Sequence, residues 1–176
     1  MCNPPGGDWS GMSIRNNSCE YRWLSLPRVS FNGKRPDHVI QLFGLKEKPV
    51  ILAIESKEKG QDLETDVGIH LKNYIHNLLS FTPSVVRQDT KDWAIAKNKC
   101  NIQDYIYISV GAFLSDERVD KEELFDKTQC DMLFDLYPDR TNSRWLLNVT
   151  CGEEYQYIKE YLSNLLAGTA GFIVLN

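Results

Sequence analysis

Three charged residues lie where two strands of the chain are expected, and their types suit metal-assisted hydrolysis. Asp37 follows a proline at the start of one apolar segment, and Glu55 and Lys57 end a second apolar run that begins at Val50. Ending a buried strand with charged side chains is costly. Strand side chains alternate between faces, so Glu55 and Lys57 point the same way. If the two strands are neighbours, two carboxylates and an ammonium group converge to hold a hard divalent cation and position a water.

The segments around these residues predict two extended pieces, a central strand and a helix. Asn32-Gly33 is typical of a hairpin turn, and it divides residues 29–43 into two strands. Residues 50–56 are apolar on both faces, which predicts a central strand covered on both sides. Between residues 62 and 80, apolar side chains recur every three or four positions, as in an amphipathic helix. The charged residues would therefore lie at the end of a buried strand, ahead of a packed helix.

The rest of the chain alternates between strand and helix patterns. Strands are expected at residues 105–110, 145–149 and 172–175, and helices at 121–136 and 153–166. This order predicts an α/β fold, with a mixed central sheet flanked by helices on both faces. A length of 176 residues suits a single domain with a sizeable core.

The charge distribution is uneven along the chain. The net charge is −4, yet residues 1–50 carry seven Lys/Arg against four Asp/Glu, whereas residues 101–176 carry six against thirteen. A local basic rim attracts phosphate groups even on an acidic domain. A solvated surface is the alternative interpretation of the same charges.

Several other classes of function lose support. The five cysteines are widely spaced and form no C-x-x-C pair, so neither a disulfide framework nor a zinc site is expected. The three histidines are not spaced as a ligand set, and P-loop, dinucleotide-binding and serine-hydrolase motifs are absent. With no apolar run long enough to span a membrane and no signal-peptide pattern, a cytoplasmic protein is expected.

Pro36-Asp37, followed after seventeen residues by Glu55-Ser56-Lys57, resembles the signature of the PD-(D/E)XK nuclease superfamily. The resemblance covers residues 28–82, and within the superfamily the chain looks most like type II restriction endonucleases. It implies a restriction-endonuclease-like fold. It also implies a Mg²⁺-dependent endodeoxyribonuclease of a restriction system, with Mn²⁺ as a substitute, that hydrolyses double-stranded DNA to 5′-phosphate and 3′-hydroxyl ends.

The resemblance gives each motif residue a role. Asp37, Glu55 and the backbone carbonyl of Ser56 would bind the metal, and Lys57 would contact the attacking water or neutralise the transition state. Many members add a carboxylate from a helix before the first core strand. Glu20, in a short helix expected from Cys19, is the acidic residue placed for that role.

Further residues are candidates for contact with DNA. Lys34 and Arg35 precede the motif, and Lys59 and Gln61 follow it, so all four could touch the phosphate backbone.

The sequence leaves several alternatives open. A cut through both strands needs two active sites, which implies a homodimer or a partner subunit. One alternative is that the chain is the catalytic portion of a larger enzyme. Repair or junction-resolving nucleases share the fold. A non-catalytic binding or regulatory domain could keep it, in which case Glu55 and Lys57 would be a surface ion pair.

Overall fold

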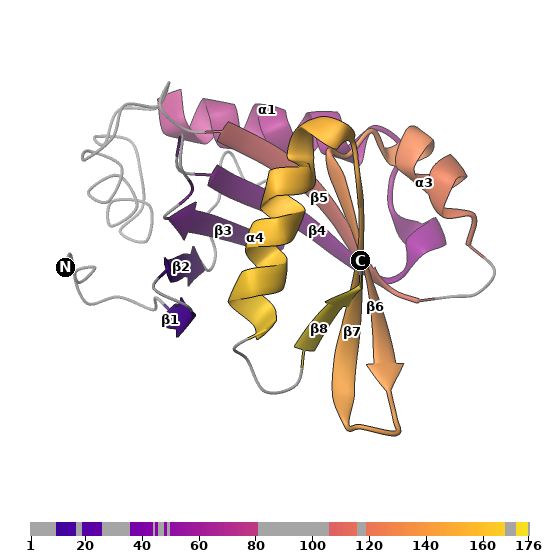
Figure 1. Ribbon diagram of the computed structural model, residues 1–176. Helices are drawn as coiled ribbons and strands as arrows, with labels where there is room; N and C mark the ends of the chain where they lie inside the picture. The colour runs from indigo at the N-terminus through magenta and orange to yellow at the C-terminus, as the bar shows by residue number, and fades with distance from the viewer. Residues whose placement is uncertain are drawn as a thin grey trace.

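The computed structural model describes residues 10–16, 19–25, 36–43, 45, 48, 50–80, 106–115, 119–167 and 172–175. They form one sheet whose eight strands lie side by side in chain order (Figure 1). The strands are β1 (Ser10–Asn16), β2 (Cys19–Ser25), β3 (His38–Phe43), β4 (Val50–Lys59), β5 (Ile106–Leu114), β6 (Met132–Asp139), β7 (Arg144–Cys151) and β8 (Phe172–Leu175). The helices are α1 (Val67–Ser80), α3 (Lys121–Thr128) and α4 (Gln156–Ala167), with short 3₁₀ turns η1 (Gly60–Asp62) and η4 (Glu153–Tyr155).

The sheet is mixed. Strands β1 to β4 pair antiparallel, β5 is parallel to β4, and β6 is parallel to β5. Strand β7 is antiparallel to β6, and β8 is parallel to β7. Parallel neighbours need a crossover, and each of the three crossover segments contains one of the helices that the structure describes. The predicted α/β class with a mixed sheet is confirmed.

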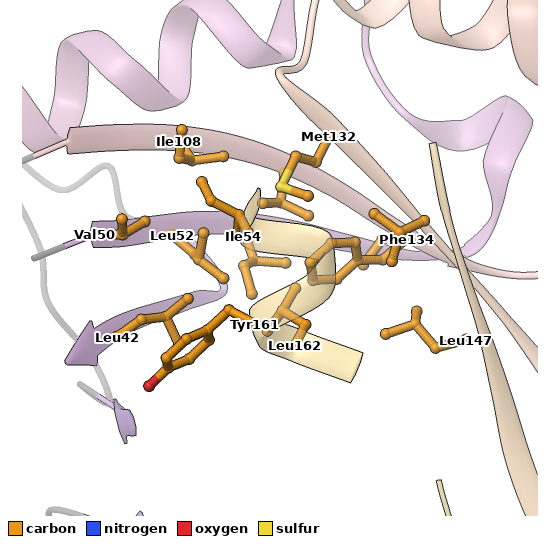
Figure 2. Packing of buried hydrophobic residues seen from close by; sticks show 14 of the residues in the cluster. Leu42, Val50, Leu52, Ile54, Ile108, Met132, Phe134, Leu147, Tyr161 and Leu162 are labelled. Carbon is orange, nitrogen blue, oxygen red and sulfur yellow. The ribbon is translucent and has the colours of Figure 1, made fainter. Parts of the chain in front are cut away.

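The face of the sheet that α4 covers holds a core of buried apolar side chains. Leu52 and Ile54 of β4 pack there with Tyr161 and Leu162 of α4 (Figure 2), and all four side chains are buried. Because strand side chains alternate, the even-numbered residues of β4 share this face. Ser56 follows in the same row.

Helix α1 packs on the opposite face. Ile51 and Ala53 of β4 are buried there, as are Val67 and Leu71 of α1, and none of them belongs to the α4 cluster. The helix contacts both β4 and β5. Helices therefore flank the sheet on both sides, and the odd-numbered row of β4 runs under α1 towards the charged end of the strand.

The beginning of α1 is fixed against the end of α3. The Asp66 N–H donates to the Lys127 carbonyl at 3.1 Å, and the Gln129 amide donates to the Asp66 carboxylate at 2.5 Å. Gly68 faces this junction, where an added Cβ would lie 2.2 Å from the Gln129 carbonyl oxygen. Only glycine allows so close an approach. This contact holds the segment that leads from β4 into α1.

Two expected helices differ from the structure. Residues 19–25 form strand β2, so the short helix expected at Cys19 is wrong. The helix expected at 121–136 ends at Thr128, where Gln129 adopts a left-handed conformation, and β6 follows. The strands expected at 105–110, 145–149 and 172–175 and the helices expected at 62–80 and 153–166 are confirmed, but α1 begins only at Val67 and β5 continues to Leu114.

The turn expected at Asn32-Gly33 lies outside the described residues. Within the described ranges, no helix is long and apolar enough to cross a membrane.

Candidate metal and phosphate site

Glu55 and Lys57 lie on one face of β4, near its carboxyl end, and they contact each other. The Nζ atom of Lys57 is 2.5 Å from Oε1 of Glu55, and the two side chains are 32% and 21% exposed. At this exposure, a ligand from solvent can reach both groups, yet the protein holds their geometry. Their neighbours on β5 are Gly111 and Phe113, so an apolar wall lies on that side of the pair.

Asp37 reaches the same end of β4 from the neighbouring strand. Pro36 is buried and Asp37 is exposed, immediately before the first pair of the β3–β4 ladder. The Oδ2 atom of Asp37 accepts a hydrogen bond from the Ser56 N–H at 2.8 Å and another from Ser56 Oγ at 3.1 Å. The structure thus brings Asp37 into contact with Ser56, the residue between Glu55 and Lys57.

A β-bulge follows these residues. Lys57 pairs with Phe113, and Lys59 pairs with the very next residue of β5, so Glu58 is the extra residue of β4. Bulges bend a strand and redirect its side chains, and they are common beside active sites. Here the bulge ends the regular pairing of β4 directly after Lys57.

Carboxylates raise the pKa of Lys57 above its ordinary value. The hydrogen bond to Glu55 is the largest cause, partial burial opposes it, and the charges of Glu55, Asp37 and Glu64 add to the rise. Lys57 therefore carries its positive charge at neutral pH. A charged ammonium group stabilises negative charge on a phosphate but cannot take a proton from water. A charged ammonium group can also stabilise a hydroxide, so the charge of Lys57 is compatible with both roles expected for it.

Comparisons of the chain with protein-family models, with curated proteins and with solved structures found no match. The chemistry of the site is therefore argued from its own residues.

The donor set at this site suits Mg²⁺ or Mn²⁺ more than a nitrogen- or sulfur-binding metal. Asp37, directly before β3, and Glu55, on β4, supply hard carboxylate oxygens. Mg²⁺ is usually bound by one or two carboxylates, with water and substrate phosphate completing its shell. Among the described residues, no group of three His, Cys, Asp or Glu could hold a metal ion. A cation here would thus depend on two carboxylates and on the substrate.

Glu20 does not belong to this site. It lies on β2 and pairs with Arg15 of β1. Strand β3 separates β2 from β4, and the register places Arg22 beside Phe43, at the end of β3 that faces Val50. Glu20 continues beyond that point, at the opposite end of β4 from Glu55. The proposal that Glu20 supplies a third carboxylate is wrong, because the segment is a strand that carries it away from the motif.

The candidate DNA contacts separate into two groups. Lys34 and Arg35 lie outside the described residues. Lys59, on the last position of β4, and Gln61, in η1, are both exposed beside the bulge. The backbone carbonyl of Gln61 accepts a hydrogen bond from Lys127 at 3.4 Å. Both remain candidates for phosphate contact.

The structure contains a second polar cluster that sequence reasoning missed. The Asp131 carboxylate accepts hydrogen bonds from Lys72 Nζ at 2.5 Å, from Tyr155 at 3.1 Å and from the N–H and Oγ of Ser109 at 2.8 and 2.9 Å. Ser109 is fully buried. These residues come from α1, β5, η4 and the turn before β6, far apart in sequence, so no local pattern indicates them. Every group is satisfied within the cluster, which makes it a structural clamp.

A cavity of about 290 Å³ lies beside this clamp. It is lined by Phe125, Asp126, Gln129, Cys130, Asp131, Gly152, Glu154 and Tyr155. None of the motif residues lines it. Burial raises the pKa of the Cys130 thiol to about 11, so this thiol is not a nucleophile at neutral pH.

Proposed function

We propose that this chain is a Mg²⁺-dependent endonuclease of the restriction-endonuclease-like fold that cuts double-stranded DNA. One observation carries the proposal. Asp37, separated from the Glu55-Ser56-Lys57 segment by seventeen residues, is hydrogen-bonded to the middle of that segment. The motif that resembles the PD-(D/E)XK signature is therefore one cluster in space. The strand-to-strand pairing and the helix after it, which the resemblance implies for residues 28–82, support the same proposal.

The residues present divide the work of phosphodiester hydrolysis. Asp37 and Glu55 would hold a divalent cation, which when bound supplies charge relief to the phosphate and a more acidic water. Hydrolysis joins a water oxygen to phosphorus and breaks the bond to the 3′ oxygen, giving a 5′-phosphate and a 3′-hydroxyl. Lys57, charged and partly exposed, stabilises the negative charge that develops on the phosphate oxygens.

Plasmid cleavage tests this proposal. Supercoiled DNA incubated with the full chain and Mg²⁺ should be nicked or linearised, and EDTA should stop the reaction. Asp37→Asn and Glu55→Gln should each lower the rate about a hundredfold or more, because each removes a charge needed for metal and transition state. Glu58→Gln is the matched control, since Glu58 is an exposed carboxylate on the same strand. Full activity of Glu55→Gln would contradict the assignment.

The ends of the products separate the related functions. Sequenced ends that share a motif favour a type II restriction enzyme, and cuts at branched or damaged DNA favour a repair or junction-resolving nuclease. Random nicks favour a catalytic portion whose target recognition lies in a partner or another domain. Binding of DNA without any cut, at every metal concentration, favours a non-catalytic regulatory domain. A homodimer or a partner subunit is part of the proposal, because two strands need two sites.

A further inference from the structure

We propose that Ser56, the middle residue of the Glu-x-Lys segment, is a positioning residue that orients the Asp37 carboxylate for the cation. The inference rests on the proposed function and deepens it. It differs from the role that the resemblance gives to Ser56, which involves only its backbone carbonyl. Here the N–H and the hydroxyl of Ser56 act through Asp37.

The position of Ser56 in the ladder explains why its N–H is available. The last pair of the β3–β4 ladder joins His38 to Ile54, so regular pairing with β3 has ended before Ser56. A backbone N–H at this point needs another acceptor. The Asp37 carboxylate supplies it at 2.8 Å.

The hydroxyl of Ser56 makes the second contact to the same oxygen. Its Oγ lies 3.1 Å from Oδ2 of Asp37, so two donors from one residue bind one carboxylate oxygen. This fixes the rotation of the Asp37 side chain, which is otherwise exposed and free to turn. Both hydrogen bonds from Ser56 go to Oδ2, so the Oδ1 atom of Asp37 takes no part in this contact. Hydrogen bonds that orient a ligating carboxylate are as much part of a metal site as the ligands.

Side-chain alternation along β4 separates the Ser56 hydroxyl from the ion pair of Glu55 and Lys57. Glu55 and Lys57 occupy one face of β4, and Ser56 points to the other, so the hydroxyl does not compete for space with the ion pair. A residue at this position with no hydroxyl keeps the N–H bond but loses the second donor. The N–H alone allows the carboxylate to pivot about one bond.

Mn²⁺ affinity, measured by calorimetry on the full chain without DNA, tests the inference. Ser56→Ala should weaken binding about tenfold, and Ser56→Thr, which keeps the hydroxyl, should restore it. In the Asp37→Asn background, Ser56→Ala should cause no further loss, since the hydroxyl acts through Asp37. Ser56→Cys keeps the side-chain volume with a weak donor, and replaces the alanine variant if thermal unfolding shows that Ser56→Ala disturbs the fold.

The outcomes distinguish this inference from the proposed function. If the unaltered chain binds no Mn²⁺, or if Glu55→Gln binds as well as the unaltered chain, the proposed site is overturned and the inference falls with it. If the unaltered chain binds and Glu55→Gln does not, but Ser56→Ala binds normally, only the role of Ser56 is overturned. An equal loss from Ser56→Ala in both backgrounds also overturns it. Amide hydrogen exchange of Ser56 checks the contact independently of metal: Asp37→Ala should speed it.

Discussion

The contact between Glu55 and Lys57 joins a candidate metal ligand, the Glu55 carboxylate, to the positively charged ammonium group of Lys57. Lys57 Nζ lies 2.5 Å from one oxygen of the Glu55 carboxylate, Oε1, and its charge repels a second cation nearby. Binding of metal and pairing with Lys57 are therefore in competition at Glu55. The ion pair holds the carboxylate in place before metal arrives, at the cost of some metal affinity.

Removal of the ammonium group should separate binding from catalysis. We expect Lys57→Met to bind Mn²⁺ about threefold to tenfold more tightly than the unaltered chain, because one repelling charge near the site is gone. The same variant should lose DNA cleavage, because charge stabilisation of the phosphate is lost. Calorimetry and plasmid cleavage measure the two effects. Weaker Mn²⁺ binding by Lys57→Met would show that the ammonium group supports the site instead of competing with metal.

At the scale of elements, the Asp131 cluster ties four of them together. Lys72 comes from α1, Ser109 from β5 and Tyr155 from η4, and all three donate to one carboxylate ahead of β6. The N–H and hydroxyl of Ser109 are buried, so water cannot replace the Asp131 carboxylate as their hydrogen-bond acceptor. The clamp holds α1 on the parallel half of the sheet.

Asp131→Ala should therefore destabilise the fold strongly. We expect a loss of about 2–4 kcal/mol in the free energy of unfolding, since a buried N–H, a hydroxyl and a lysine lose their partner together. Asp126→Ala, at an exposed position on α3, is the control and should change stability by less than about 0.5 kcal/mol. Urea denaturation measures both. Equal stability of the two variants would mean that the cluster contributes little.

The elements that sequence predicted best are those whose pattern reflects burial directly. Strand β4 follows from an unbroken apolar run, and α1 from a regular helical spacing. The boundary between α3 and β6 could not be predicted in this way, because Met132, Leu133 and Phe134 fit a buried helix as well as a strand. Gln129 ends α3 in a left-handed conformation, where glycine is the usual signal.

The site divides in a similar way. Glu55 and Lys57 were predictable from strand alternation, which is local. The hydrogen bonds from Ser56 to Asp37 depend on how β3 and β4 pair, so no short sequence pattern predicts them. The clamp at Asp131 joins residues from separate parts of the chain, so it cannot be predicted from a local pattern either. The helix predicted around Glu20 was wrong because the preceding residues resemble a helix start, whereas the segment pairs in the sheet as a strand.

At the scale of the whole molecule, alkaline pH should weaken the fold through Tyr155. Burial, aided by the nearby charge of Asp131, raises the pKa of Tyr155 to about 12, above its ordinary value of about 10. The folded state thus favours the protonated phenol. Its contribution to stability is complete below pH 10 and is lost as the pH rises through about 12.

Tyr155→Phe should remove this dependence. We expect the variant to lose about 1 kcal/mol at pH 8, where the hydrogen bond to Asp131 is made. Between pH 10 and 12, its stability should fall less steeply than that of the unaltered chain, because no phenol ionises at this position. Urea unfolding at pH 8, 10 and 11 measures both effects. Parallel pH curves for the two proteins would show that Tyr155 titrates as it does in the unfolded chain.

The order of the strands has a consequence for how the protein is made. Each strand of the sheet lies beside the strand synthesised before it. A growing chain can therefore add one strand at a time to the free edge of the sheet as it leaves the ribosome, with no earlier gap to fill. The segments that carry Asp37, Glu55 and Lys57 are synthesised before β5, so the four antiparallel strands β1 to β4 can pair before β5 joins them.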